Sequence, residues 1–178
     1  MRQFAENRIF ISDSPSGDLE SFAKNENTTY MGSAADAESF EQALTGEVDR
    51  LRKKRSASGL SPREFIASEP PTLVLIDDGE AFISYTTTVQ ALVEPQLRNA
   101  SDFGICFIGT SLGSKLRGFD TVSNMFKSPQ AGLILGNPGE AMTHYPGATS
   151  IPRHKPTPEI GFWYKRGDIK KIKLPFVE

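Results

Sequence analysis

Short runs of aliphatic residues alternate along the chain with segments of helical periodicity. Residues 73–76 are four consecutive aliphatics, which indicates a strand buried on both faces, as in a parallel sheet. Strand candidates, that one included, lie at residues 8–12, 28–31, 72–76, 104–110 and 132–136. Because strands and helix-length segments alternate, the pattern predicts a three-layer α/β domain with helices flanking the sheet.

Helical periodicity is clearest after Asp36, which is a candidate N-cap. This helix would end in the basic run 52–55, where cations suit the negative end of the helix dipole. The run could instead bind nucleic acid, but a solvated helix end is the more common case. Further helical segments are predicted at about 80–98, interrupted near 86–88 and at Pro95, and around 116–126. The apolar stripe of the first helix consists of Ala37, Phe40, Leu44, Val48 and Leu51.

The end of the chain changes to the two-residue alternation of strands. Residues 161–164 and 169–174 flank a turn and predict a β-hairpin. Its second strand would place Ile172 and Leu174 on one face and Lys171 and Lys173 on the other. Trp163 and its aromatic neighbours could form a binding platform, although packing in the core of the hairpin is more common.

Length and composition fit one globular domain over residues 1–178, with 38% hydrophobic and 24% charged residues. The net charge of −2 is uneven, since residues 1–150 carry −6 and residues 151–178 carry +4. Most of the chain would therefore repel a phosphate backbone, which makes nucleic acid an unfavourable partner. The single cysteine, Cys106, lies in an apolar run and predicts a buried, unreactive thiol.

Asp77 and Asp78 end the most aliphatic strand. In a nucleotide hydrolase this pattern is a Walker B motif, in which Asp77 would hold Mg²⁺ and Asp78 would orient the attacking water. Acidic residues also mark the exposed carboxyl end of an ordinary strand, and the pattern alone leaves both interpretations open. The chain has no phosphate-binding loop of the form G-x-x-x-x-G-K-[ST], and the nearest segment, 109–116, departs from it on both sides of Lys115.

In order along the chain, several segments resemble the last FtsK/SpoIIIE-type ATPase domain of EssC, the membrane coupling ATPase of the Firmicute type VII secretion system. Each segment is moderately specific, but the ordered set spans nearly the whole chain. The segments are residues 9–14, residues 73–82, the strand through Thr110 and Ser111, residues 132–140 and residues 161–175.

The resemblance implies a RecA-like, P-loop NTPase-type sheet with a C-terminal β-hairpin, in which the Walker A strand and loop have no counterpart. Asp77 and Asp78 fall at the Walker B pair, with Asp77 as the Mg²⁺ ligand. Thr110 and Ser111 fall near the sensor position that contacts nucleotide. The family's catalytic acid is often Glu, whereas this chain has Asp78. Mg-ATP is the cofactor of the family; without the Walker A lysine we expect no cofactor and no ATP hydrolysis in this chain alone.

The same resemblance implies a place on the cytoplasmic side of a membrane-anchored motor, in substrate recognition or coupling for protein export. The implied partners are secreted WXG-type proteins, other secretion components and preceding ATPase domains of the same polypeptide, and the motor would be a hexamer. The acidic body fits protein cargo better than DNA.

Two other functions remain open from the residues. A DNA-translocase motor domain would show salt-dependent DNA binding. A Mg²⁺-dependent phosphatase would lack its usual D-x-D nucleophile signature, because Gly79 follows Asp78. The phosphatase site would consist of Asp77, Asp78, Thr110 and Lys115.

Overall fold

The computed structural model describes residues 7–112, 124, 131–135, 159–165 and 168–174. The chain divides into two compact units, Met1–Ser111 and Leu112–Glu178. None of the described helices is long and apolar enough to cross a membrane.

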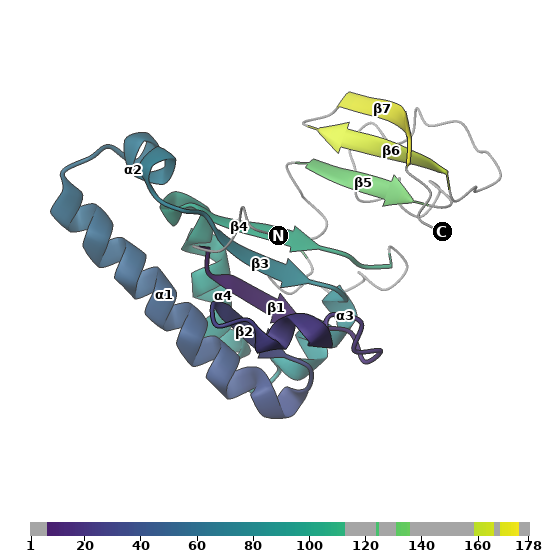
Figure 1. Cartoon of the computed structure of the whole chain (residues 1–178), viewed down its shortest axis with the longest axis horizontal. Helices are drawn as coiled ribbons and strands as arrows, with labels where there is room; N and C mark the ends of the chain where they lie inside the picture. The colour runs from purple at the N-terminus through teal and green to yellow at the C-terminus, as the bar shows by residue number, and fades with distance from the viewer. Residues whose placement is uncertain (1–6, 113–123, 125–130, 136–158, 166–167, 175–178) are drawn as a thin grey trace. The chain divides into compact units, whose positions relative to one another are not determined.

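The first unit is built on a parallel sheet with the strand order β2-β1-β3-β4 (Figure 1). The strand predicted at 72–76 lies between two neighbouring strands, and its aliphatic residues 73–76 are buried or half-buried, as expected inside a parallel sheet. The strands are β1 (Ile9–Ser12), β2 (Thr28–Met31), β3 (Thr72–Ile76) and β4 (Ile105–Gly109). The helical elements are η2 (Glu20–Lys24), η3 (Ala34–Asp36), α1 (Ala37–Ser58), α2 (Pro62–Ser68), α3 (Gly79–Tyr85), α4 (Gln90–Asn99) and η4 (Ala100–Phe103).

Helix α1 confirms the predicted apolar stripe, all of which is buried. Asp36 is the N-cap residue of α1, as predicted, but its side chain makes no capping hydrogen bond to that helix. The 3₁₀ turn η3 precedes the helix and begins after Ser33. Asp36 accepts hydrogen bonds from the backbone N–H of Gly32 and Ser33, at 3.1 and 3.0 Å. Its carboxylate therefore completes the capping box of η3, in which it is the third residue, and does not cap α1. Gly59, at φ 66°, ends the helix in the left-handed conformation that favours glycine.

A cluster of aromatic side chains packs α1 and α3 against the sheet. Phe10 of β1 and Phe40 of α1 meet edge to face at 5.7 Å between ring centroids, and Phe40 meets Phe82 of α3 at 6.3 Å. All three rings are almost completely buried. Such contacts add to the stabilisation that burial of the rings provides. The two helices therefore cover the same face of the sheet.

The basic run at the end of α1 is engaged within the unit. The guanidinium groups of Arg52 and Arg55 lie over the Phe103 ring, at 5.7 and 5.6 Å from its centroid. Lys54 forms an ion pair with Glu69 at 2.7 Å. These contacts favour the interpretation of the run as a helix end over that of a nucleic-acid patch.

The prediction for Cys106 was wrong, because its side chain is exposed. Among the described strands, β4 pairs only with β3 and is therefore an outer strand of the sheet. Alternate residues of β4 point to opposite faces, and Ile105 is buried whereas Ile108 is 54% exposed. An apolar run thus predicted the strand correctly, but it could not show which of its faces is covered.

The long helical segment predicted at 80–98 is two helices. Helix α3 ends at Tyr85 and α4 begins at Gln90, so the threonine run between them interrupts the helix as predicted. Pro95, by contrast, lies inside α4. The helix predicted around 116–126 falls, except for residue 124, outside the described residues.

The described part of the second unit is an antiparallel sheet with the order β5-β6-β7. Strand β5 is Ala131–Leu135, β6 is Ile160–Lys165 and β7 is Asp168–Lys173. The predicted hairpin is therefore confirmed as β6 and β7. Ile172 pairs with Gly161 and Lys171 pairs with Phe162, so the isoleucine and the lysine lie on opposite faces, as predicted. Parallel sheet, helices and C-terminal hairpin together confirm the predicted α/β fold.

Candidate functional site at the carboxyl ends of the strands

The carboxyl ends of β1, β3 and β4 meet at one edge of the parallel sheet. Ser12 lies beside Ile76, and Ile76 lies beside Gly109, so the residues that follow each strand are neighbours. The backbone N–H of Asp77 donates to Ser12 O at 2.9 Å, and that of Thr110 donates to Ile76 O at 2.8 Å. The structure thus brings together two residues predicted for the site, Asp77 and Thr110.

Thr110 ties the end of β4 to the loop after β3. Its hydroxyl donates a hydrogen bond to the carbonyl oxygen of Asp77. Its own carbonyl accepts from the backbone N–H of Gly79 at 3.0 Å. Ser111, the other residue predicted at the sensor position, follows directly and is partly buried. The hydroxyl of Thr110 is thus engaged by the protein backbone, and a sensor role of either residue stays a prediction.

Asp78 caps helix α3. Its Oδ1 accepts hydrogen bonds from the backbone N–H groups of Glu80 and Ala81, at 2.8 and 3.4 Å. Aspartate is among the preferred N-caps, and its charge is also favourable at the positive end of the helix dipole. The carboxylate expected to orient a water is therefore bound to the first turn of its own helix. No hydrogen bond or ion pair within residues 7–112 reaches the carboxylate of Asp77.

Asp13 is the residue of this edge that was not predicted as part of the site. It is completely buried and accepts hydrogen bonds from the backbone N–H groups of Ser14 and Leu19, both at 2.9 Å. A third bond, of 2.7 Å, comes from the hydroxyl of Tyr30. The pKa of Tyr30 is raised above its ordinary value. Burial is the largest cause, and the hydrogen bond to Asp13 and the negative charge of Asp13 raise it further. Like Asp77, Asp13 directly follows a largely apolar strand, and that pattern was the signal that could have identified it.

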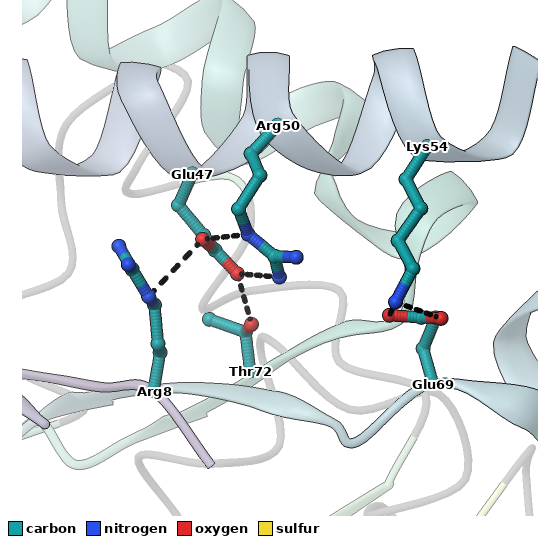
Figure 2. A network of polar contacts seen from close by, with 6 residues as sticks. All are labelled: Arg8, Glu47, Arg50, Lys54, Glu69 and Thr72. Carbon is teal, nitrogen blue, oxygen red and sulfur yellow. Dashed lines mark hydrogen bonds and ion pairs between the residues drawn. The ribbon is translucent and has the colours of Figure 1, made fainter. Parts of the chain in front are cut away.

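A second polar cluster lies at the opposite edge, where β1 and β3 begin (Figure 2). Glu47 of α1 is completely buried and accepts two hydrogen bonds of 2.8 Å from the Arg50 guanidinium. Its carboxylate also accepts from the Thr72 hydroxyl at 2.9 Å, and Nε of Arg8 lies 3.5 Å away. We call these four residues the Glu47 network.

The ionisation of Glu47 depends on these partners. Burial alone would raise the pKa of Glu47. The hydrogen bonds from Arg50 and Thr72 and the positive charges of Arg50 and Arg8 outweigh burial, so the pKa is lowered below its ordinary value. The network therefore holds an ionised carboxylate in the interior.

The described residues do not by themselves fit Mg-ATP. Among them, no group of three or more Asp, Glu, His or Cys side chains is arranged to hold a metal ion. No ion pair within the described part of the chain involves Asp13, Asp77 or Asp78. A triphosphate needs cations or a cradle of backbone N–H groups, and at this edge the N–H groups of α3 are already bound by Asp78.

No family model matches the chain, and no curated protein matches it in sequence. Its fold does match solved structures. The cytoplasmic domain of EssC aligns with 97% of this chain at a TM-score of 0.72 and 16% identity. EssC from Geobacillus thermodenitrificans, comprising ATPases 2 and 3, aligns with 97% of the chain at a TM-score of 0.71 and 18% identity. EccC from Thermomonospora curvata, comprising ATPases 2 and 3 in complex with a signal sequence peptide, aligns with 97% of the chain at a TM-score of 0.66 and 18% identity.

The chain therefore has the fold of EssC and EccC ATPase domains, which confirms the resemblance at the level of the fold. It spans about a third of the length of these structures, with 34%, 32% and 31% of each covered.

Proposed function

We propose that this chain is part of a type VII secretion motor and acts in substrate recognition or coupling, without hydrolysing ATP through its own residues. Its place would be on the cytoplasmic side of a membrane-anchored complex. The observation that carries the proposal is the match of almost the entire chain to the EssC and EccC ATPase fold.

Recognition is supported by the nature of one similar protein. The Thermomonospora curvata structure contains a signal sequence peptide bound to EccC. A chain of the same fold is a reasonable receptor for a secreted protein, and WXG-type proteins are the partners that we propose. Preceding ATPase domains of the same polypeptide, in a hexameric motor, and further secretion components would complete the assembly.

The absence of hydrolysis is supported by the carboxyl edge. The sequence has no G-x-x-x-x-G-K-[ST] loop, and Asp78 is bound to the backbone of α3. Hydrolysis requires a cation to neutralise the phosphates and a carboxylate able to orient water. If Mg-ATP does bind in the complete motor, Asp77 is the residue that we propose as the Mg²⁺ ligand.

Calorimetry on the full chain tests both parts of the proposal. We expect a WXG-type secreted protein of the same system to bind, and we expect Mg-ATP to give no binding at concentrations up to about 1 mM. Duplex DNA at low salt is the control for the translocase alternative, because binding there would depend strongly on salt. Failure of the secreted protein to bind refutes recognition, and tight ATP binding that is lost in Asp77→Asn refutes the absence of nucleotide chemistry.

A further inference from the structure

One face of the β5-β6-β7 sheet exposes large apolar side chains. In antiparallel strands, directly paired residues share a face, so Leu133, Trp163 and Lys170 lie side by side across the sheet. Trp163 and Leu133 are each 40% exposed, and Leu135 of the same face is 59% exposed. The opposite face holds the buried side chains of Ile134, Phe162 and Tyr164. We call the exposed side the Trp163 face.

The leucines of the Trp163 face gather over a glycine. A Cβ atom on Gly161 would lie 2.9 Å from Leu133 Cδ1, 3.2 Å from Leu135 Cδ2 and 3.4 Å from Leu174 Cδ1. These side chains therefore pack over the position that a larger residue would fill. An apolar floor results, and it lies directly beside the exposed indole of Trp163. Contiguous apolar surface of this kind is typical of interaction sites.

Charged side chains border this floor. Trp163, Lys165, Asp168 and Lys170 line a hollow of about 200 Å³. Lys165 pairs across the sheet with Asp168, which places both on the Trp163 face beside Lys170. The two lysines outnumber the one aspartate, so the hollow favours a ligand that carries negative charge.

We propose that the Trp163 face binds an acidic protein segment, with an apolar side chain over the leucine floor and a carboxylate beside Lys165 and Lys170. Charge complementarity favours an acidic segment. The leucines favour a peptide over a nucleic acid, since bases could stack on Trp163 but would place no aliphatic group over the leucine floor. The natural ligand would be a segment of the exported protein, and to that extent the inference rests on the proposed function.

Trp163 makes the site directly observable, because it is the only tryptophan of the chain. The probe is a synthetic peptide of repeated Glu-Leu-Glu-Phe units, titrated into the full chain while the tryptophan emission is recorded. A peptide in which lysine replaces every glutamate, and an oligothymidylate, are the comparison ligands. We expect the acidic peptide alone to shift the emission.

Two lysine variants on adjacent positions of β7 provide the matched test. Lys170 lies on the Trp163 face, whereas Lys171 pairs with Phe162 and lies on the other face. In fluorescence anisotropy with a labelled acidic peptide, Lys170→Glu should weaken binding about tenfold through the loss of a charge-assisted contact. Lys171→Glu should change it by less than about twofold. Circular dichroism verifies that both variants are folded.

The inference is overturned if no acidic peptide binds below about 1 mM, if both lysine variants lose affinity equally, or if the oligothymidylate binds more tightly than the peptide. Its failure is distinguishable from that of the proposed function. A secreted protein that binds the wild type and Lys170→Glu equally well removes this site and keeps recognition. An acidic peptide that binds as expected while the secreted protein does not keeps the site and removes the secretion partner.

Discussion

The two edges of the parallel sheet treat their carboxylates in different ways. At the edge where the strands begin, Glu47 is neutralised by charge, through the guanidinium groups of Arg50 and Arg8. At the edge where the strands end, Asp13 and Asp78 accept hydrogen bonds from backbone N–H groups, and Asp13 also accepts one from the hydroxyl of Tyr30. One edge compensates charge with charge, and the other compensates charge with dipoles.

This difference teaches that a cluster of acidic residues does not by itself make a catalytic centre. Asp13 and Asp78 shape the loop and helix at this edge, because they satisfy backbone N–H groups that would otherwise lack partners. A catalytic carboxylate must instead be available to a ligand. In the described part of the edge, Asp77 alone meets that condition, whereas Asp13 and Asp78 are occupied by the fold.

The largest expected effect belongs to Glu47. Glu47→Gln removes the charge that Arg50 and Arg8 face and should lower the free energy of unfolding by about 3 kcal/mol, at the lower end for a broken buried ion pair. The lower end is appropriate because the side chains of Arg8 and Arg50 are 56% and 45% exposed and can be hydrated. Urea denaturation measures the difference, and Glu38→Gln, on the exposed face of the same helix, should stay within about 0.5 kcal/mol.

The pH dependence separates the charge of Glu47 from its shape. The pKa of Glu47 is lowered in the folded state, so its contribution is complete above the unfolded pKa of about 4.3 and is lost as pH falls through the folded value. The gap between wild type and Glu47→Gln should therefore narrow between neutral pH and pH 3. A gap that stays constant over that range would mean that packing, and not the ion pair, accounts for the difference.

Asp13 should give the next largest effect. Asp13→Asn places an amide N–H₂ among three donors and should cost about 2 kcal/mol of unfolding free energy, as expected for lost hydrogen bonds to a charged group. Tyr30→Phe removes a single one of these bonds and should cost less, about 1 kcal/mol. Asp18→Asn is the control in the same loop, because Asp18 is exposed and should matter little. Equal effects of Asp13→Asn and Asp18→Asn would contradict this assignment.

Strand positions and the α1 stripe could be predicted from the sequence because burial of apolar side chains determines both. The strand predicted at 72–76 and the hairpin at the chain end are present as expected. Periodicity does not specify which face of a strand is covered, and for that reason Cys106 was wrongly predicted to be buried. The exposure of Trp163 was left open on the same ground, since alternation assigns faces but not their coverage.

The candidate site could be predicted only as a set of positions. Asp77 and Thr110 are neighbours because parallel strands end together, which the sequence pattern already indicates. Which partner a carboxylate binds depends on local backbone geometry. The sequence around Asp78 is therefore compatible both with a catalytic acid and with a helix cap. The Glu47 network joins residues far apart in the chain, so no short-range sequence pattern predicts it.

Asp78 tests the distinction between a cap and a catalytic acid. Asp78→Ala should lower the free energy of unfolding by about 1 kcal/mol, and Asp78→Asn by a few tenths, because asparagine caps helices about as well as aspartate. Urea denaturation of both variants measures these values. A catalytic acid would show a different pattern in activity, since asparagine would abolish activity as completely as alanine. Similar stability losses in the two variants would therefore count against the cap.

The smallest effect is expected at Asp77, and it decides what the carboxyl edge can do. Its position is maintained by its backbone, since its N–H donates to Ser12 O and its carbonyl accepts from Thr110. Asp77→Asn should thus change the free energy of unfolding by less than about 0.5 kcal/mol. Calorimetry should find no Mg-ATP binding in either the wild type or the variant. If the wild type binds Mg-ATP and the variant does not, the carboxylate is a metal ligand and the edge belongs to the chemistry of the motor. If neither binds, the acids that serve the fold at this edge are Asp13 and Asp78, and the carboxylate of Asp77 has no part in nucleotide binding by this chain.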